Sequence, residues 1–201
     1  MEQNRGYAPA RIALALALVA TLGCAEAGGG ETGQPDAVES TAVQVPPAPD
    51  PADVESPETL VRAVYDVISG ERGEARDWDR WHSLFFPGAM LHPVGPADGS
   101  GEGWTVSSMT PADFVELVDS SFVADGFYEV EIGDVTEVYG NIAHRFSSYA
   151  SFRSSTETEP FNRGINSFQL LDDGDRWWVL SIFWQHEFQA GQIPEKYLYR
   201  P

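Results

Sequence analysis

The chain has 201 residues and a formal net charge of −19, because 31 acidic residues outnumber 12 lysines and arginines. So much negative charge repels phosphate backbones, which argues against nucleic acid as a partner. The hydrophobic share of 42% is enough for a packed core, and at this length we expect one domain with an additional terminal segment.

The first 24 residues have the pattern of an export signal. Arg5 and Arg11 accompany an apolar run of eleven residues, 12–22, which is shorter than the ~20 residues needed to cross a bilayer. The run leads to Cys24, the only cysteine, and the letters TLGC that end there resemble a bacterial lipobox. This resemblance implies export and a lipid anchor on Cys24 at the bacterial cell envelope. The alternative is ordinary cleavage after the AEA of residues 25–27, which would give a soluble secreted or periplasmic protein.

Residues 25–55 have the composition of a linker. They contain many glycines and prolines and seven acidic residues, but no basic and no aromatic residue. Such a segment buries too little apolar surface to offset its chain entropy. We predict a disordered acidic tether that joins the anchor to a folded domain at residues 56–201.

Three helices are predicted in the first half of the domain. Ser56 is a favourable N-cap with proline after it, and apolar residues recur at helical spacing up to Gly70. A second helix is expected from Asp77 to about residue 85. A third begins at Thr110, where Asp113 forms a capping-box-like pair. Between the last two, residues 89–94 suit a short strand and residues 94–106 a loop.

Four strands are predicted in the second half, at 127–139, 142–153 and in a hairpin over 163–187. Gly140-Asn141 suits a tight hairpin turn. In the last strand one face is predicted to hold Trp178, Leu180, Ile182, Trp184 and His186. Both faces of this strand are largely apolar, which predicts a central strand covered on both sides. Helices followed by hairpin-linked strands indicate the α+β class.

Several local patterns resemble the nuclear transport factor 2-like superfamily, which includes polyketide-cyclase-like (SnoaL-like) proteins and ketosteroid isomerases. The patterns are DWDRW at 77–81 with LFFPGA at 84–89, GNIA at 140–143 and DGDRWWV at 173–179. The resemblance implies a curved antiparallel sheet wrapped on N-terminal helices, which forms a cone with an apolar pocket. It also implies that a homodimer is possible, and it leaves open whether the protein is an enzyme.

Enzymes of this family commonly place a carboxylate or a histidine in the cone. His82 follows Trp78 by four residues and Asp79 by three, so all three could share one side of a helix. Asp79 could orient the imidazole while Trp78 supplies apolar surroundings that tune a general base. The alternative is a structural histidine that is hydrogen-bonded to the backbone.

A ligand pocket is predicted along the last strand and its neighbours. Its candidate residues are Trp78, Trp178, Ile182, Trp184, His186, Tyr149 and Asn166. If one face of the strand lines the cone, His186 lies near its mouth, and Tyr149 and Asn166 contribute polar groups. The alternative assigns the tryptophans to the core and the polar residues to cross-strand contacts.

Neither a metal site nor a cofactor is expected. No two of the four histidines are closer than ten positions, whereas zinc sites use short spacings, and no nucleotide-binding motif occurs. The sequence therefore favours a cell-envelope protein that binds a small apolar or amphipathic molecule or a partner protein. The alternative is a cofactor-free isomerase or dehydratase that uses the His82–Asp79 pair.

Overall fold

The computed structural model describes residues 45–97 and 103–199. Cys24, the predicted signal 1–24 and the part of the tether up to residue 44 lie outside these ranges. No helix within the described ranges is long and apolar enough to cross a membrane.

The folded part of the chain begins before the boundary expected at Ser56. Pro51–Asp53 forms a short 3-10 helix, η1, and Val54 after it is buried at 5% exposure. Asp53 forms an ion pair with Arg80, with 2.7 Å between Oδ2 and Nε. These residues have tether-like composition, but tertiary contacts hold them on the domain.

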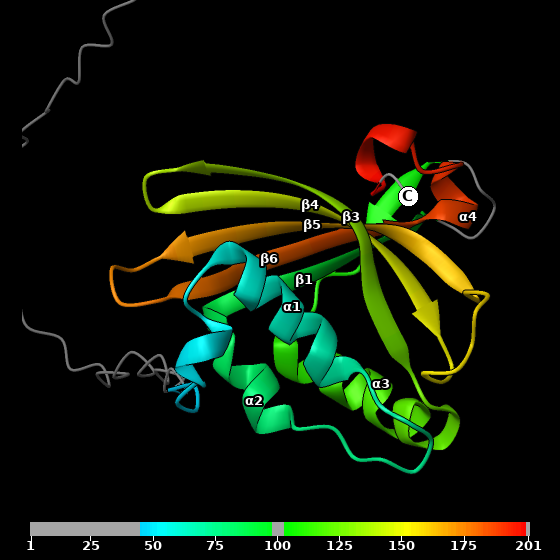
Figure 1. Cartoon of the computed structure of the whole chain (residues 1–201), viewed down its shortest axis with the longest axis horizontal. Coiled ribbons are helices and arrows are strands. Elements are labelled where there is room, and N and C mark those ends of the chain that lie inside the picture. The colour runs from blue at the N-terminus through cyan, green and yellow to red at the C-terminus, as the bar shows by residue number, and fades with distance from the viewer. Residues whose placement is uncertain (1–44, 98–102, 200–201) are drawn as a thin grey trace, which may run out of the picture. The chain divides into compact units, whose positions relative to one another are not determined.

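Three helices cover one face of the sheet, as Figure 1 shows: α1 Pro57–Ile68, α2 Trp78–Ser83 and α3 Pro111–Asp125. The predicted caps are confirmed: the Ser56 side chain accepts the backbone N–H of Thr59, and Thr110 and Asp113 form a reciprocal capping box. The second helix is shorter than predicted, because Phe85 already belongs to the first strand.

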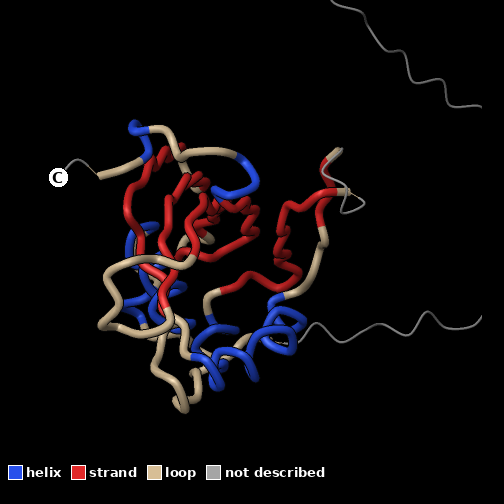
Figure 2. Tube along the Cα trace, turned by 90° about the vertical axis from the view of Figure 1, so that its right-hand side faces the viewer, coloured by secondary structure: helices blue, strands red, loops and turns tan. Residues whose placement is uncertain are grey.

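The helices and strands form an α+β fold, which confirms the predicted class. The strands are β1 Phe85–Pro96, β2 Trp104–Val106, β3 Tyr128–Tyr139, β4 Ile142–Phe152, β5 Asn162–Asp172 and β6 Trp177–His186. They lie in one sheet in the order β2-β1-β6-β5-β4-β3, which curves around the helices (Figures 1 and 2). One pair departs from the expected antiparallel arrangement: β1 runs parallel to β6, with Leu91 opposite Ile182. The long connection between these strands permits parallel pairing.

A β-bulge in β6 changes the predicted faces of that strand. Gln169 of β5 pairs with Ser181 and Leu170 pairs with Val179, so Leu180 is an extra residue between them. The bulge breaks the simple alternation, and Trp178 does not share the face of Ile182. Leu180, predicted on the face of Ile182, is instead 43% exposed. Phe183 on the outer face is 46% exposed, so that face is not covered as predicted.

The core lies between α1 and the concave face of the sheet. The buried side of α1 includes the predicted set Leu60, Val61, Val64, Val67 and Ile68. Phe168 and Val179 of the sheet are fully buried against this set. Each such side chain contributes roughly 1.5–3 kcal/mol on burial, so this contact stabilises the fold substantially.

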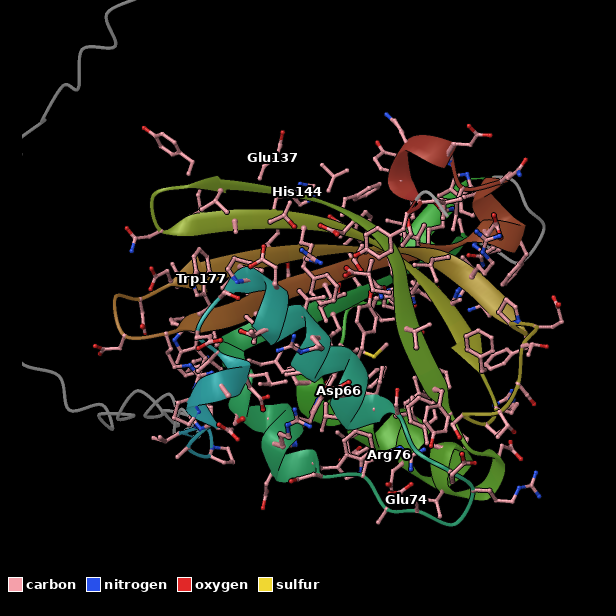
Figure 3. The ribbon with its side chains drawn as sticks, in the orientation of Figure 1. Asp66, Glu74, Arg76, Glu137, His144 and Trp177 are labelled. Atoms are coloured by element: carbon pink, nitrogen blue, oxygen red, sulfur yellow. The ribbon has the colours of Figure 1, made fainter. Side chains whose placement is uncertain are left out.

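A buried arginine holds the loop between α1 and α2. Arg76 donates from Nε to the Ile68 carbonyl at 2.9 Å and from Nη2 to the Gly70 carbonyl at 2.8 Å. It thereby satisfies carbonyls at the C-terminal end of α1 that have no partner within the helix. Figure 3 shows Arg76 on the helical side of the domain, below the sheet.

Candidate functional site

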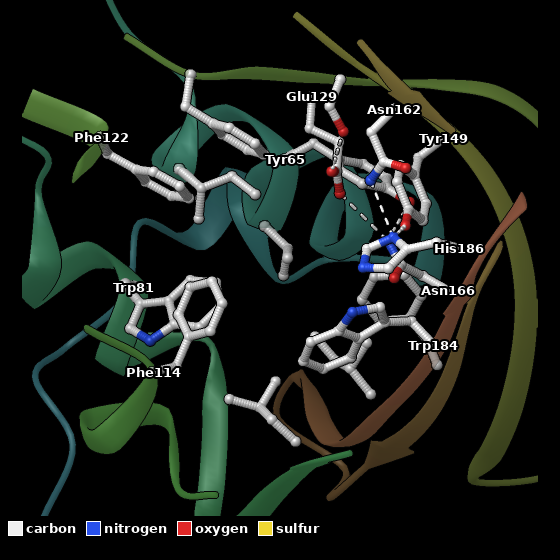
Figure 4. A pocket seen from close by; sticks show the side chains of 17 residues that line it. Tyr65, Trp81, Phe114, Phe122, Glu129, Tyr149, Asn162, Asn166, Trp184 and His186 are labelled. Carbon is white, nitrogen blue, oxygen red and sulfur yellow. Dashed lines mark hydrogen bonds between the residues drawn. The ribbon is translucent and has the colours of Figure 1, made fainter. Parts of the chain in front are cut away.

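A cavity of about 160 Å³ lies between the helices and the concave face of the sheet. Aromatic side chains form a large part of its wall: Tyr65, Trp81, Phe114, Phe122, Phe127, Tyr149, Phe168 and Trp184. Its other polar groups are Glu129, Ser151, Asn162, Asn166 and His186. In Figure 4, Trp81, Phe114 and Phe122 lie on one side of the cavity, and Glu129, Asn162 and His186 lie on the other.

The aromatic side of the cavity is built by α2 and α3. The ring of Trp81 stacks on Phe114, with 5.0 Å between centroids. Phe122 stacks on Phe127 at 4.2 Å. The indole N–H of Trp81 donates to the Pro111 carbonyl at 3.1 Å, so its hydrogen-bonding capacity is already used. This side therefore offers ring surfaces to a ligand.

Glu129 of β3 supplies the only carboxyl group among the described residues that line the cavity. Its oxygens accept hydrogen bonds from Ser151 Oγ at 2.8 Å and from Asn166 Nδ2 at 3.3 Å. Desolvation in the apolar cavity raises the pKa of Glu129 to about 7, although both hydrogen bonds favour the ionised form and oppose the rise. Glu129 can therefore take up and release a proton near neutral pH.

His186, Tyr149 and Asn162 form a second polar group beside Glu129. The Nδ1 atom of His186 lies 2.7 Å from the Tyr149 hydroxyl and 2.9 Å from Asn162 Nδ2. Burial lowers the pKa of His186, which favours the neutral form of the ring. Burial, with a smaller contribution from Glu129, raises the pKa of Tyr149, so its hydroxyl stays protonated. This end of the cavity thus holds neutral hydrogen-bonding groups.

A chain of hydrogen bonds connects the cavity to an ion-paired cluster on β3 and β4. Asn166 Nδ2 donates to the Tyr65 hydroxyl at 3.1 Å, and that hydroxyl lies 2.6 Å from Ser147 Oγ. Ser147 donates to Glu131 at 2.6 Å, and Arg145 binds both oxygens of Glu131 at 2.9 and 2.6 Å. Because every link is buried or half-buried, the chain fixes the polar wall in place.

The structure brings five of the predicted pocket residues together: Ile182, Trp184, His186, Tyr149 and Asn166 all line the cavity. Trp178 does not line it. The bulge in β6 turns Trp178 away, and its indole N–H donates to Asp173 at 2.6 Å.

The predicted acid–base pair lies outside the cavity. Asp79 is exposed and His82 is half-buried on α2, and neither lines the cavity. Trp78 is also outside it, and its indole donates to Asp119 of α3 at 2.7 Å. The spacing of Trp78, Asp79 and His82 predicted that they share one side of the helix facing the cavity. In the structure, Trp81 is the residue of α2 that faces the cavity. Glu129 is the titratable carboxyl that does reach it.

The sequence pattern did not mark Glu129, Asn162 or Tyr65 as pocket residues. The one available signal was the pair of acids Glu129 and Glu131, which recur at the two-residue period of a strand. In an alternating strand the apolar residue is expected to face the core, yet Val130 is 45% exposed. Within residues 45–97 and 103–199, no three histidine, cysteine or acidic side chains are grouped so that they could hold a metal ion.

No protein-family model matches the chain, and no curated protein matches it. Solved structures do show similarity. A protein of unknown function with a cystatin-like fold from Nostoc punctiforme is 8% identical, with a TM-score of 0.47 over 64% of this chain and 86% of that one. An NTF2-like protein of unknown function from Methylobacillus flagellatus is 12% identical, with a TM-score of 0.43 over 64% and 87%.

A further similar structure is that of a proposed ketosteroid isomerase from Parabacteroides distasonis. It is 12% identical, with a TM-score of 0.42 over 67% of this chain and 96% of that one. These similarities concern the arrangement of helices and strands, and no activity or residue role is transferred from them.

Proposed function

We propose that the domain binds a small, largely apolar molecule with one hydrogen-bonding end. The observation that carries this proposal is the cavity, which has aromatic rings on one side and polar groups on the other. An apolar cavity of about 150 Å³ is known to hold benzene. The volume of about 160 Å³ therefore suits a ligand built on one ring. The apolar body would lie against Trp81 and Phe114, and its polar end beside His186 and Asn162.

Binding is tested with toluene and benzyl alcohol as probes in a thermal-shift assay. We expect both to raise the melting temperature, because the ligand binds the folded state alone. Ile182→Trp, which fills the cavity, should abolish the shift. Leu180→Trp, on the same strand but outside the cavity, should retain it.

Trp184→Ala offers a second variant if Ile182→Trp does not fold. It enlarges the cavity, so it should favour larger probes such as butylbenzene over toluene. If the wild type shows no shift with any probe, or if Ile182→Trp keeps a full shift, the binding proposal is wrong.

We also propose that the domain acts at the bacterial cell envelope, attached through a lipid on Cys24. The lipobox-like letters that end at this sole cysteine support it. Cys24→Ala should release the protein from the membrane fraction, because one acyl-modified residue would be its only anchor. Unchanged membrane partition of Cys24→Ala in a fractionated bacterial host would refute lipidation.

A second candidate function is cofactor-free proton transfer, such as an isomerase or dehydratase performs. Glu129 favours it, because a carboxyl with a pKa of about 7 in an apolar site is suited to act as a general base. Glu129 would take this role in place of the His82–Asp79 pair, and the Tyr149 hydroxyl would donate a hydrogen bond to a developing oxyanion. The Glu129→Gln variant tests this function.

A further inference from the structure

The cavity has an unusual electrostatic character. Eight of its lining residues are aromatic, and aromatic ring faces carry partial negative charge. It also contains the Glu129 carboxyl, whereas none of the described residues that line it is a lysine or an arginine. Every strong electrostatic feature of this cavity therefore favours positive charge.

The groups that face Glu129 from the surrounding elements do not offset this preference. They are Tyr65 of α1, Tyr149 and Ser151 of β4, Asn166 of β5 and His186 of β6. The two tyrosines stay protonated, because burial raises the pKa of each hydroxyl. Burial likewise lowers the pKa of His186 and so favours its neutral form.

The nearby charges on β3 and β4 are already paired. Glu131, two residues along β3, is bound by Arg145, and Arg145 also contacts Asp134 at 2.9 Å. Neither Arg145 nor Asp134 lines the cavity. Arg145 is thus committed to other carboxylates, including Glu58 at 3.9 Å, and none of the described residues that line the cavity is a cationic partner for Glu129.

We propose that the preferred ligand is a small organic cation, with a protonated amine or a quaternary ammonium group attached to a ring-sized apolar body. This inference rests on the proposed binding function and specifies its ligand class. A cation in the cavity would pair with the Glu129 carboxylate and lie against ring faces such as those of Tyr65 and Trp184. Anionic ligands would meet a carboxylate and no compensating charge.

The surroundings of the cavity also favour cations. The net charge of −19 raises the local concentration of cations around the protein, which increases their rate of association. Within the cavity, the apolar walls weaken the competition from water, so that a cation–π contact is stronger than it is on an exposed surface. A neutral ligand of the same shape gains neither effect.

Binding of a cation should depend on pH through Glu129. The carboxyl must lose its proton to pair with the ligand, and its pKa is about 7. Affinity should therefore fall about tenfold for each pH unit below that value. The expected loss between about pH 8 and about pH 5 is on the order of 100-fold.

The test compares benzylammonium, which stays protonated over this range, with benzyl alcohol, a neutral molecule of nearly the same shape. Each is titrated into the full chain by isothermal calorimetry at about pH 5 and about pH 8. We expect benzylammonium to bind at least tenfold more tightly than benzyl alcohol at the higher pH. Its advantage should disappear at the lower pH, while benzyl alcohol should change little.

Glu129→Gln should remove both the preference for benzylammonium and its pH dependence. Glu137→Gln is the matched control, because Glu137 lies on the same strand but is exposed and points away from the helices (Figure 3). This control removes the same charge from the protein and should bind as the wild type does. It therefore separates a local effect from one of net charge.

Each contrary outcome has a distinct meaning. If benzyl alcohol binds as tightly as benzylammonium at about pH 8, the cation proposal is overturned and the binding function stands. The cation proposal also fails if Glu129→Gln retains the preference for benzylammonium. If neither molecule binds at either pH, the binding function itself fails, and the cation proposal fails with it.

Discussion

Replacement of Arg145 by methionine should lower the free energy of unfolding by about 3–5 kcal/mol, the cost of leaving half-buried carboxylates without their buried partner. Arg145 is 5% exposed, and its guanidinium contacts Glu131 at 2.6 Å and Asp134 at 2.9 Å. Methionine fills much of the same volume but carries no charge. The two carboxylates would then repel each other in a half-buried setting. Urea denaturation at neutral pH measures the loss.

Arg163→Met is the control for this substitution. Arg163 lies 3.6 Å from Glu187, and its side chain is 33% exposed. An ion pair of this kind contributes about 0–1 kcal/mol, so we expect a small change. Arg145→Lys keeps the charge but loses the paired hydrogen bonds. Its loss of stability should therefore lie between those of Arg145→Met and Arg163→Met. Equal losses for Arg145→Met and Arg163→Met would show that the buried ion pairs do not contribute more than a surface pair.

Glu129→Gln should remove a pH dependence of stability between about pH 4.5 and about pH 7. The folded state holds the Glu129 proton up to a pKa of about 7, whereas the unfolded chain releases it near 4.5. The folded state therefore binds more protons in this window, and stability must fall as pH rises through it. The limiting size of this effect is roughly 3 kcal/mol. A neutral glutamine has no proton to lose.

Denaturation of the wild type and Glu129→Gln across this pH range measures the effect. The variant should gain stability relative to the wild type as pH rises, and the gain should level off above about pH 7. Glu137→Gln, which alters an exposed side chain of the same strand, should follow the wild type. Parallel curves for the wild type and Glu129→Gln would contradict a raised pKa at Glu129.

The Glu129→Gln variant also tests whether the domain catalyses proton transfer. With cyclohexanone as a probe in heavy water, a base in the cavity would exchange the hydrogens next to the carbonyl for deuterium. NMR would detect this exchange with the wild type and its loss in Glu129→Gln. If the wild type gives only the background rate, the enzymatic candidate is not supported for this probe, whereas the binding function is unaffected.

Some elements were predictable because local interactions define them. Ser56 and Thr110 cap their helices through side chains and backbone groups three residues away. Gly140 takes a φ of 56°, which suits the predicted hairpin turn between β3 and β4. These features need only neighbouring residues, and the pattern of the sequence contains them.

Other elements depend on the register between strands. The bulge at Leu180 turns Trp178 out of the face that alternation assigned to it. A second bulge, between Glu131 and Gly133 of β3, lies where the C-terminal residues cross: a side chain at Gly133 would collide with the Tyr197 carbonyl. Periodicity assumes regular strands, so neither bulge could be read from it.

The sequence by itself therefore determined the α+β class, the helix starts, the hairpins and the inward position of Ile182, Trp184 and His186. Tertiary structure decided which carboxyl enters the cavity. Asn166 and Tyr65, which fix the polar wall around Glu129, are 101 positions apart, and Asn166 and Glu129 are 37 apart. Contacts between such distant residues arise only when the sheet closes around α1. That closure raises the pKa of Glu129 and leaves His82 and Asp79 outside the cavity.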